Sequence, residues 1–149
     1  MATPTFFHEF FNHVATGVHN LSTGSFKVGL TNTAPSAAND DTWSDITEIT
    51  PGNGYTDDGN TLDSEAWAET GAGTAIWQFT CSDEVITASG GNIGPFRYPV
   101  IYNDTPTSPA DPLVCMIDYG SGITVTDGNT FTLDVGSNGI FRVGTGTIS

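Results

Sequence analysis

Short apolar runs alternate along most of the chain with turns rich in Gly, Asn, Asp and Pro. The segment Ser25–Thr31 places Phe26, Val28 and Leu30 on one face, a pattern typical of a half-buried β-strand. Runs of similar length recur as far as residue 143. Many short strands at this spacing predict an all-β domain, either a β-sandwich or a jelly-roll-like fold.

The centre of the predicted sheet is a pair of apolar runs, Phe96–Tyr102 and Leu113–Tyr119, which flank a proline-rich loop. Side chains alternate between the two faces of a strand, so Leu113 and Cys115 are expected on one face and Val114 on the other. A run that is apolar on both faces is typical of a central strand covered on both sides. Because proline cannot continue a strand ladder, we expect two neighbouring strands joined by an exposed loop.

Further elements follow from local patterns on either side of this pair. Apolar residues at threefold spacing in Trp43–Ile49 indicate a short helical turn or an irregular segment. The segment Gly73–Cys81 is aromatic and extended, as in a strand. Near the C-terminus, Ile123–Thr126 and Thr130–Val135 predict a hairpin across a turn that contains Asp-Gly-Asn.

Residues 3–17 predict an N-terminal amphipathic helix. Thr3 can cap its start, Pro4 suits its first position and Gly17 can end it. Its apolar stripe recurs three and four residues apart and consists of Phe6, Phe7, Phe10, Phe11, Val14 and Val18. The stripe requires a surface to bury against, either the protein's own sheet or a neighbouring subunit. We therefore expect a helical arm over residues 1–23 and a β-sandwich domain over residues 24–149.

Length and charge narrow the class of protein. At 149 residues the chain suits a single domain with its own core. It carries 17 acidic residues against Lys27, Arg97 and Arg142, a net charge of −14, which disfavours nucleic acid and anionic membranes as partners. Apolar runs fall short of the roughly 20 residues of a membrane span, and the N-terminus lacks the basic region of a secretory signal.

Cysteine and histidine positions argue against a metal centre. Cys81 and Cys115 each lie inside an expected strand and are predicted to be buried free thiols. His8, Glu9 and His13 spell H-E-x-x-x-H, whereas the zinc motif places its histidines at i and i+4 on one helical face. We therefore predict no metal ligands among these residues.

Other chemistry is weakly indicated. The chain lacks a G-x-S-x-G nucleophile motif, and its histidines all lie in the first 19 residues. The oxygen-rich segment Asp57–Glu65 could attract calcium but does not fit the EF-hand spacing. Exposed tryptophans could bind sugars, although tryptophans are more often buried. Carboxylates that could act in pairs on glycosides are simply abundant, and include Glu48, Asp63, Glu65, Glu69 and Glu84.

From Ser25 to Val143 the chain resembles a family of small structural proteins encoded by tailed bacteriophages. The resemblance is carried by strand and turn motifs rather than by catalytic signatures. These motifs are Phe26–Pro35, Asp45–Ile49, Gly52–Thr56, Tyr98–Asp104, Pro112–Leu113, Ile117–Gly120 and Asp127–Phe131.

This resemblance implies a non-enzymatic virion protein without a cofactor, made in the host cytoplasm. Among virion positions we favour the capsid exterior, as a decoration or cement protein that binds the major capsid protein. By analogy with other decoration proteins we expect a homo-oligomer, preferably a trimer. The alternatives are a tail or fibre component and a carbohydrate-binding β-module that contacts the host surface. The candidate contact residues are the N-terminal phenylalanines and an exposed loop: Phe6, Phe7, Phe10, Phe11, Asn103, Asp104, Thr105 and Pro106.

Overall fold

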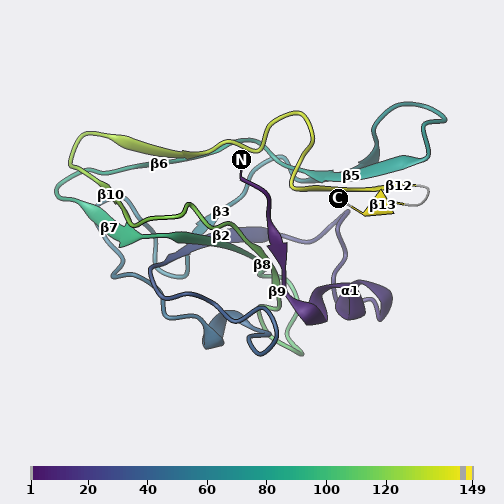
Figure 1. Ribbon diagram of the computed structural model, residues 1–149, viewed down its shortest axis with the longest axis horizontal. Helices are drawn as coiled ribbons and strands as arrows, with labels where there is room; N and C mark the ends of the chain where they lie inside the picture. Colours follow the sequence, from purple (N-terminus) through teal and green to yellow (C-terminus); the bar gives the residue numbers. More distant parts are fainter. Residues whose placement is uncertain (1, 145–146, 149) are drawn as a thin grey trace.

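The computed structural model describes residues 2–144 and 147–148, and it is mostly β, with several antiparallel sheets and one short α-helix (Figure 1). The largest sheet has five strands in the order β1 (Thr5–Phe6), β9 (Leu113–Met116), β8 (Tyr98–Asn103), β2 (Phe26–Thr31) and β3 (Asn60–Thr61). A four-stranded sheet has the order β13 (Thr147–Ile148), β12 (Phe141–Gly144), β5 (Ile76–Thr80) and β4 (Ala66–Glu69). Two further pairs are β7 (Ile93–Phe96) with β10 (Ile123–Val125) and β6 (Glu84–Thr87) with β11 (Thr130–Leu133).

The strands lie in two layers, with β2, β7, β8 and β9 in the lower layer of Figure 1 and β5, β6 and β12 in the upper one. The main core fills the space between the layers and draws residues from both. Phe26 of β2 meets Phe79 of β5 with ring centroids 4.7 Å apart. Phe26, Val28 and Leu30 are fully buried, which confirms the expected inward face of this strand.

A second, smaller cluster covers the opposite face of the five-stranded sheet. It contains Phe7, Val100 and Leu113, with Trp43 stacked on Tyr102 at a centroid distance of 4.8 Å. Trp43 lies in the 3₁₀ turn η1 (Trp43–Asp45), so the first of the two alternatives for Trp43–Ile49, a short helical turn, holds for its first three residues. Strands β8 and β9 are therefore buried on both faces, as the two-sided apolar pattern of Leu113–Tyr119 predicted for β9.

The expected face of Leu113 was wrong. Strand β8 pairs Ile101 with Cys115 but Tyr102 with Leu113, so β9 contains a β-bulge. The bulge interrupts the alternation of side chains. Leu113 consequently lies in the smaller cluster, whereas Cys115 lies in the main core.

One strand boundary and one pairing also differ from the sequence prediction. Phe96 ends β7 rather than opening the long run that follows, because the backbone N–H of Arg97 leaves the ladder and donates to Thr31 O at 3.0 Å. The predicted C-terminal hairpin is wrong, since β10 pairs with β7 while β11 pairs with β6. The intervening turn crosses between the layers, so Val125 and Leu133 reach the core from opposite sides.

The N-terminal helix is shorter than predicted. Helix α1 spans His8–Ala15, and Thr5–Phe6 instead pair with β9. Thr3 and Pro4 therefore precede the helix, which begins after an extended Phe7, where the backbone N–H of His8 donates to Ala37 O at 2.9 Å. Its predicted end is confirmed, because Gly17 adopts a φ of +80° just beyond the helix.

Gly29 of β2 permits the close contact that holds the outer cluster together. A Cβ atom on Gly29 would overlap the indole ring of Trp43. We expect Gly29→Ala to lower the free energy of unfolding by about 1–3 kcal/mol through overpacking, as measured by urea denaturation. Gly122→Ala is the matched control, because its Cβ would meet atoms no closer than 3.7 Å. Equal stability of the two variants would contradict this account of the contact.

Candidate functional site

The four N-terminal phenylalanines divide between intrachain packing and exposure. Phe7 and Phe10 are fully buried. Phe6 is partly buried and packs its ring on Phe10 and Phe141, with centroid distances of 5.4 and 5.3 Å. Phe11 remains 40% exposed. Most of the predicted stripe therefore serves the protein's own core, and Phe11 is the phenylalanine most available to a partner.

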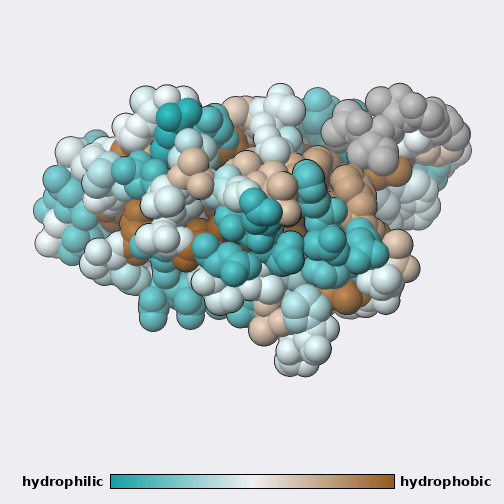
Figure 2. All heavy atoms as spheres, turned by 60° about the horizontal axis from the view of Figure 1, so that its bottom comes forward, coloured by the Kyte–Doolittle hydropathy of each residue, from teal (hydrophilic) through white to brown (hydrophobic). Residues whose placement is uncertain are grey.

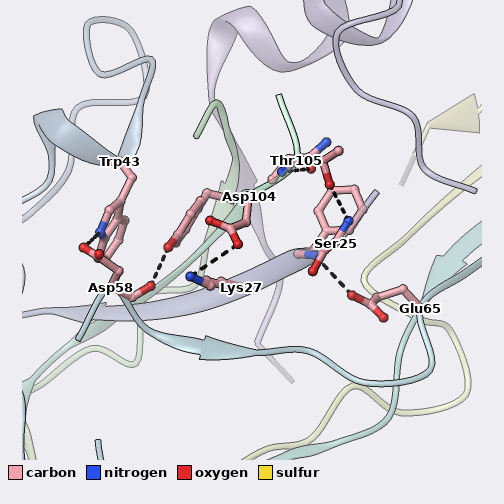
Figure 3. Close-up of polar contacts among 10 residues, drawn as sticks. Ser25, Lys27, Trp43, Asp58, Glu65, Asp104 and Thr105 are labelled. Atoms are coloured by element: carbon pink, nitrogen blue, oxygen red, sulfur yellow. Dashed lines mark hydrogen bonds and ion pairs between the residues drawn. The ribbon is translucent and has the colours of Figure 1, made fainter. Parts of the chain in front are cut away.

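The candidate loop after β8 is tied to the segment that leads into β2 (Figure 3). Thr105 Oγ1 accepts a hydrogen bond from the backbone N–H of Ser25 at 2.8 Å, and Asp104 pairs with Lys27 at 3.4 Å. Asp104 and Thr105 are exposed and Pro106 is half-buried, as suits a contact loop. Asn103, in contrast, is buried, so it supports the loop rather than touching a partner.

His19 joins the two predicted groups of contact residues. Its ring lies 5.1 Å from that of Phe10, between centroids. The side-chain Nδ2 of Asn103 donates to His19 Nδ1 at 3.2 Å, while Asn103 Oδ1 accepts from the backbone N–H of Thr105. The helix and the loop are therefore neighbours, joined through His19.

Sequence analysis missed this role of His19. After Gly17 the chain folds back, and the backbone N–H groups of Val18 and His19 both donate to His13 O, at 2.8 and 3.1 Å. The imidazoles of His13 and His19 thereby come to a centroid distance of 5.7 Å. The available signal was the helix-ending glycine, which implies a reversal that returns the next residues to the last helical turn.

Both imidazoles carry a buried nitrogen without a hydrogen-bond partner among the described residues, His13 Nδ1 and His19 Nε2. Because Asn103 donates to Nδ1, the neutral ring of His19 carries its proton on Nε2. Burial, reinforced by repulsion from His13, lowers the pKa of His19 to about 4. His19 is therefore neutral at pH 7 and is hydrogen-bonded in that form.

The H-E-x-x-x-H segment does not gather around one point. His8 is exposed, and the Glu9 carboxylate accepts a hydrogen bond from Asn12 at 2.7 Å. His13 instead approaches His19. The expectation that this segment holds no metal stays a prediction.

Glu48, Asp57 and Asp58 bring carboxylate oxygens within 4.8 Å of one another. Oxygen ligands of this kind suit hard cations such as Ca²⁺. Two of these acids also stabilise the fold. Tyr55 Oη donates a hydrogen bond to Glu48 at 2.6 Å. Trp43 Nε1 donates one to Asp58 at 3.3 Å (Figure 3). Burial raises the pKa of Glu48, and the nearby charges of Asp58 and Asp57 add to the effect.

The other acids of interest are engaged in structural contacts. Glu65 is the last residue of the oxygen-rich segment Asp57–Glu65, and it accepts a hydrogen bond from the backbone N–H of Phe26. Glu69 accepts from the backbone of Gly73 and Ala75, and Glu84 accepts from Asn60 Nδ2. Each of these carboxylates thus stabilises a strand or a turn of its own chain.

Cys81 and Cys115 are buried free thiols, as predicted. Burial raises the pKa of Cys81 to about 12 and that of Cys115 still further. Because the thiolate is the reactive form, both thiols are poor nucleophiles at neutral pH.

Comparison of the chain with known protein families, with curated proteins and with solved structures found no match. Within residues 2–144 and 147–148, no helix has both the length and the apolar character needed to cross a membrane.

His19 should make stability depend on pH. Its folded pKa of about 4 lies below the ordinary value of 6.5, so the unfolded chain takes up the proton first. The contribution is complete above pH 6.5 and is lost as the pH falls toward 4. Over that range wild type should lose up to about 3 kcal/mol more unfolding free energy than His19→Gln, as measured by urea denaturation at each pH.

The matched control for this experiment is His8→Gln, which removes an exposed imidazole and should keep the wild-type pH dependence. The carboxylates contribute equally to all three proteins. An unchanged slope in His19→Gln would show that His19 does not titrate in the expected range.

Proposed function

We propose that this chain is a non-enzymatic virion structural protein of a tailed bacteriophage, and that it acts as a capsid decoration or cement protein. The observation that carries the proposal is the meeting of the two candidate contact segments, joined through His19. His19 packs on Phe10 and bonds Asn103, so the exposed Phe11 and the exposed loop residues Asp104 and Thr105 are held by one rigid unit. The strand and turn motifs of the phage family point in the same direction.

The fold that accompanies this proposal is a β-sandwich of jelly-roll-like type. Its support is the packing of two antiparallel layers around the main core, with strands that change layer between β10 and β11.

The proposed location is the exterior of the capsid, where the protein, made in the host cytoplasm, binds the major capsid protein as a homo-oligomer, preferably a trimer. The mechanism is additive burial. A protein that binds the assembled shell but not its separated subunits stabilises the shell by mass action at every occupied site. The net charge of −14 keeps the solvent-facing surfaces of neighbouring copies apart and the free protein soluble.

The first test is the copy number of the protein per virion, measured by quantitative mass spectrometry relative to the major capsid protein. We expect hundreds of copies per virion, as for a component that is repeated regularly over the shell. A handful of copies would instead assign the protein to the tail or a single vertex. Absence from purified particles would overturn a virion role.

A second test measures binding to expanded capsid shells. Saturation with recombinant protein should raise the temperature at which the shells disrupt. Thr105→Arg adds bulk and charge on the exposed contact loop and should weaken shell binding at least tenfold, or about 1.4 kcal/mol. Thr132→Arg makes the same change at an exposed position of β11 in the other layer and should bind normally. Saturation without a rise in disruption temperature would contradict cementing.

A carbohydrate-binding module is the second candidate, and one observation favours it. Trp77 is 43% exposed and stacks on Trp67 at a centroid distance of 6.0 Å, although Trp43 is buried as expected. Exposed aromatic faces can receive sugar rings. A glycan array that remains silent for the wild-type protein would exclude this candidate.

A further inference from the structure

An open apolar groove of about 470 Å³ lies between α1 and the four-stranded sheet. We name it the α1 groove; Phe11 and Val14 line it from the helix, and Trp67 and Phe141 line it from β4 and β12. In Figure 1 the helix lies below the end of β5 and β12. Figure 2 brings the lower side of the molecule forward and shows brown hydrophobic areas between the teal hydrophilic ones.

Exposed hydrophobic side chains concentrate around the α1 groove. Within residues 2–144, five large hydrophobic side chains are exposed, and three of them line the groove or extend it. Phe11 and Val14 line it directly. Trp77 lies in register with Val143, which lines the groove, and stacks on Trp67. Ile76, the residue before it, points to the opposite face of β5. The fifth, Val85, lies on β6 near the other end of the molecule (Figure 1).

The groove has a rigid aromatic lining. Phe10 and Phe141 meet edge to face at a centroid distance of 5.5 Å, and Trp67 approaches Phe141 at 5.9 Å. Trp77 extends this surface outward by stacking on Trp67. Preorganised aromatic side chains of this kind supply most of the binding energy at protein interfaces, because they bury large areas with little loss of conformational entropy.

The distribution of charge favours one kind of partner for the α1 groove. The described residues that line the groove include no acid, lysine or arginine, although the chain carries 17 acids, and His19 in the lining is neutral at pH 7. Glu69 lies on β4, opposite Trp77 of β5, and its carboxylate already accepts hydrogen bonds from the backbone N–H groups of Gly73 and Ala75. A basic partner would gain most on the acidic surface elsewhere. A second copy with a charge of −14 meets repulsion over that surface and least in this uncharged groove.

We propose that the α1 groove is a self-association surface, and that a second copy of this chain covers Phe11, Val14 and Trp77. The inference rests on the proposed function for the homo-oligomer and deepens it by naming the surface through which copies meet; it requires no capsid. It also sets the sign of the salt dependence. Salt screens the repulsion between two acidic copies while leaving apolar burial intact, so association strengthens as ionic strength rises.

The test is analytical ultracentrifugation of the full chain over a range of protein concentrations at low and high salt. Wild type is expected to self-associate, more tightly at high salt. Phe11→Ser and Trp77→Ser, on opposite sides of the groove, should each lower the association constant at least tenfold. Val85→Ser, which removes a side chain of 52% exposure away from the groove, is the matched control and should associate like wild type.

Several outcomes would overturn the inference. These are a wild-type protein that stays monomeric at every concentration and salt level, groove variants that associate normally, and a control that weakens association equally. Saccharide binding by a monomeric wild type would assign Trp77 to a different ligand. Circular dichroism melting establishes that each variant is folded, and Phe11→Ala replaces Phe11→Ser if the latter is not.

Shell binding separates this inference from the proposed function. Monomeric protein that still binds capsid shells would overturn self-association and the homo-oligomer, and would leave the decoration role standing. Protein that associates through the groove but ignores shells would overturn the decoration role alone.

Discussion

The burial of β8 and β9 on both faces is the constraint on which the rest of the structure depends. One face supports the main core, and the other is covered by Trp43 and Phe7. The outer cover requires the glycine at position 29, because the indole ring lies directly against the β2 backbone. Covering this outer face also sets where the helix begins. Thr5–Phe6 pair with β9, and Phe7 packs into the outer cluster. The helix therefore begins at His8. The position of α1 is thus a consequence of how the sheet is covered.

The position of α1 brings the candidate contact residues of the helix next to those of the loop after β8. The helix ends at Gly17, the chain reverses and His19 is buried between Phe10 and Asn103. A neutral imidazole at this junction links the helix, through Phe10, to Asn103 at the start of the loop, 84 positions further along the chain than His19. The hydrogen bond from Ser25 to Thr105 ties the same loop to the segment before β2. The same burial lowers the pKa of His19, so the junction is stable at neutral pH and weakens in acid. The burial of His19 therefore explains both how the helix meets the loop and why this junction is expected to weaken in acid.

The surface combines a strong negative charge with a small uncharged groove. Acidic residues distributed over the remainder of the surface favour solubility and repel copies of the same chain. The α1 groove departs from this pattern, since its lining is mainly aromatic and aliphatic, holds no carboxylate among the described residues and includes the exposed Phe11 and Val14. Contact between two copies at the groove is favoured by apolar burial, whereas contact over the rest of the surface is opposed by charge repulsion. An acidic protein can in this way remain soluble and still assemble in a defined orientation.

The sequence by itself determined the strand-rich class, the inward face of β2, the two-sided burial of β9, the helix end at Gly17 and the buried free thiols. These follow from local periodicity and from the backbone freedom of glycine, which act over a few residues. Tertiary structure decided the bulge that moved Leu113 to the other face, the separate partners of β10 and β11, and the shortened helix. It also decided which phenylalanines are buried and that His19 meets Asn103. Each of these depends on a partner distant in the chain, and local pattern carries no information about which strand edge or which ring that partner will be.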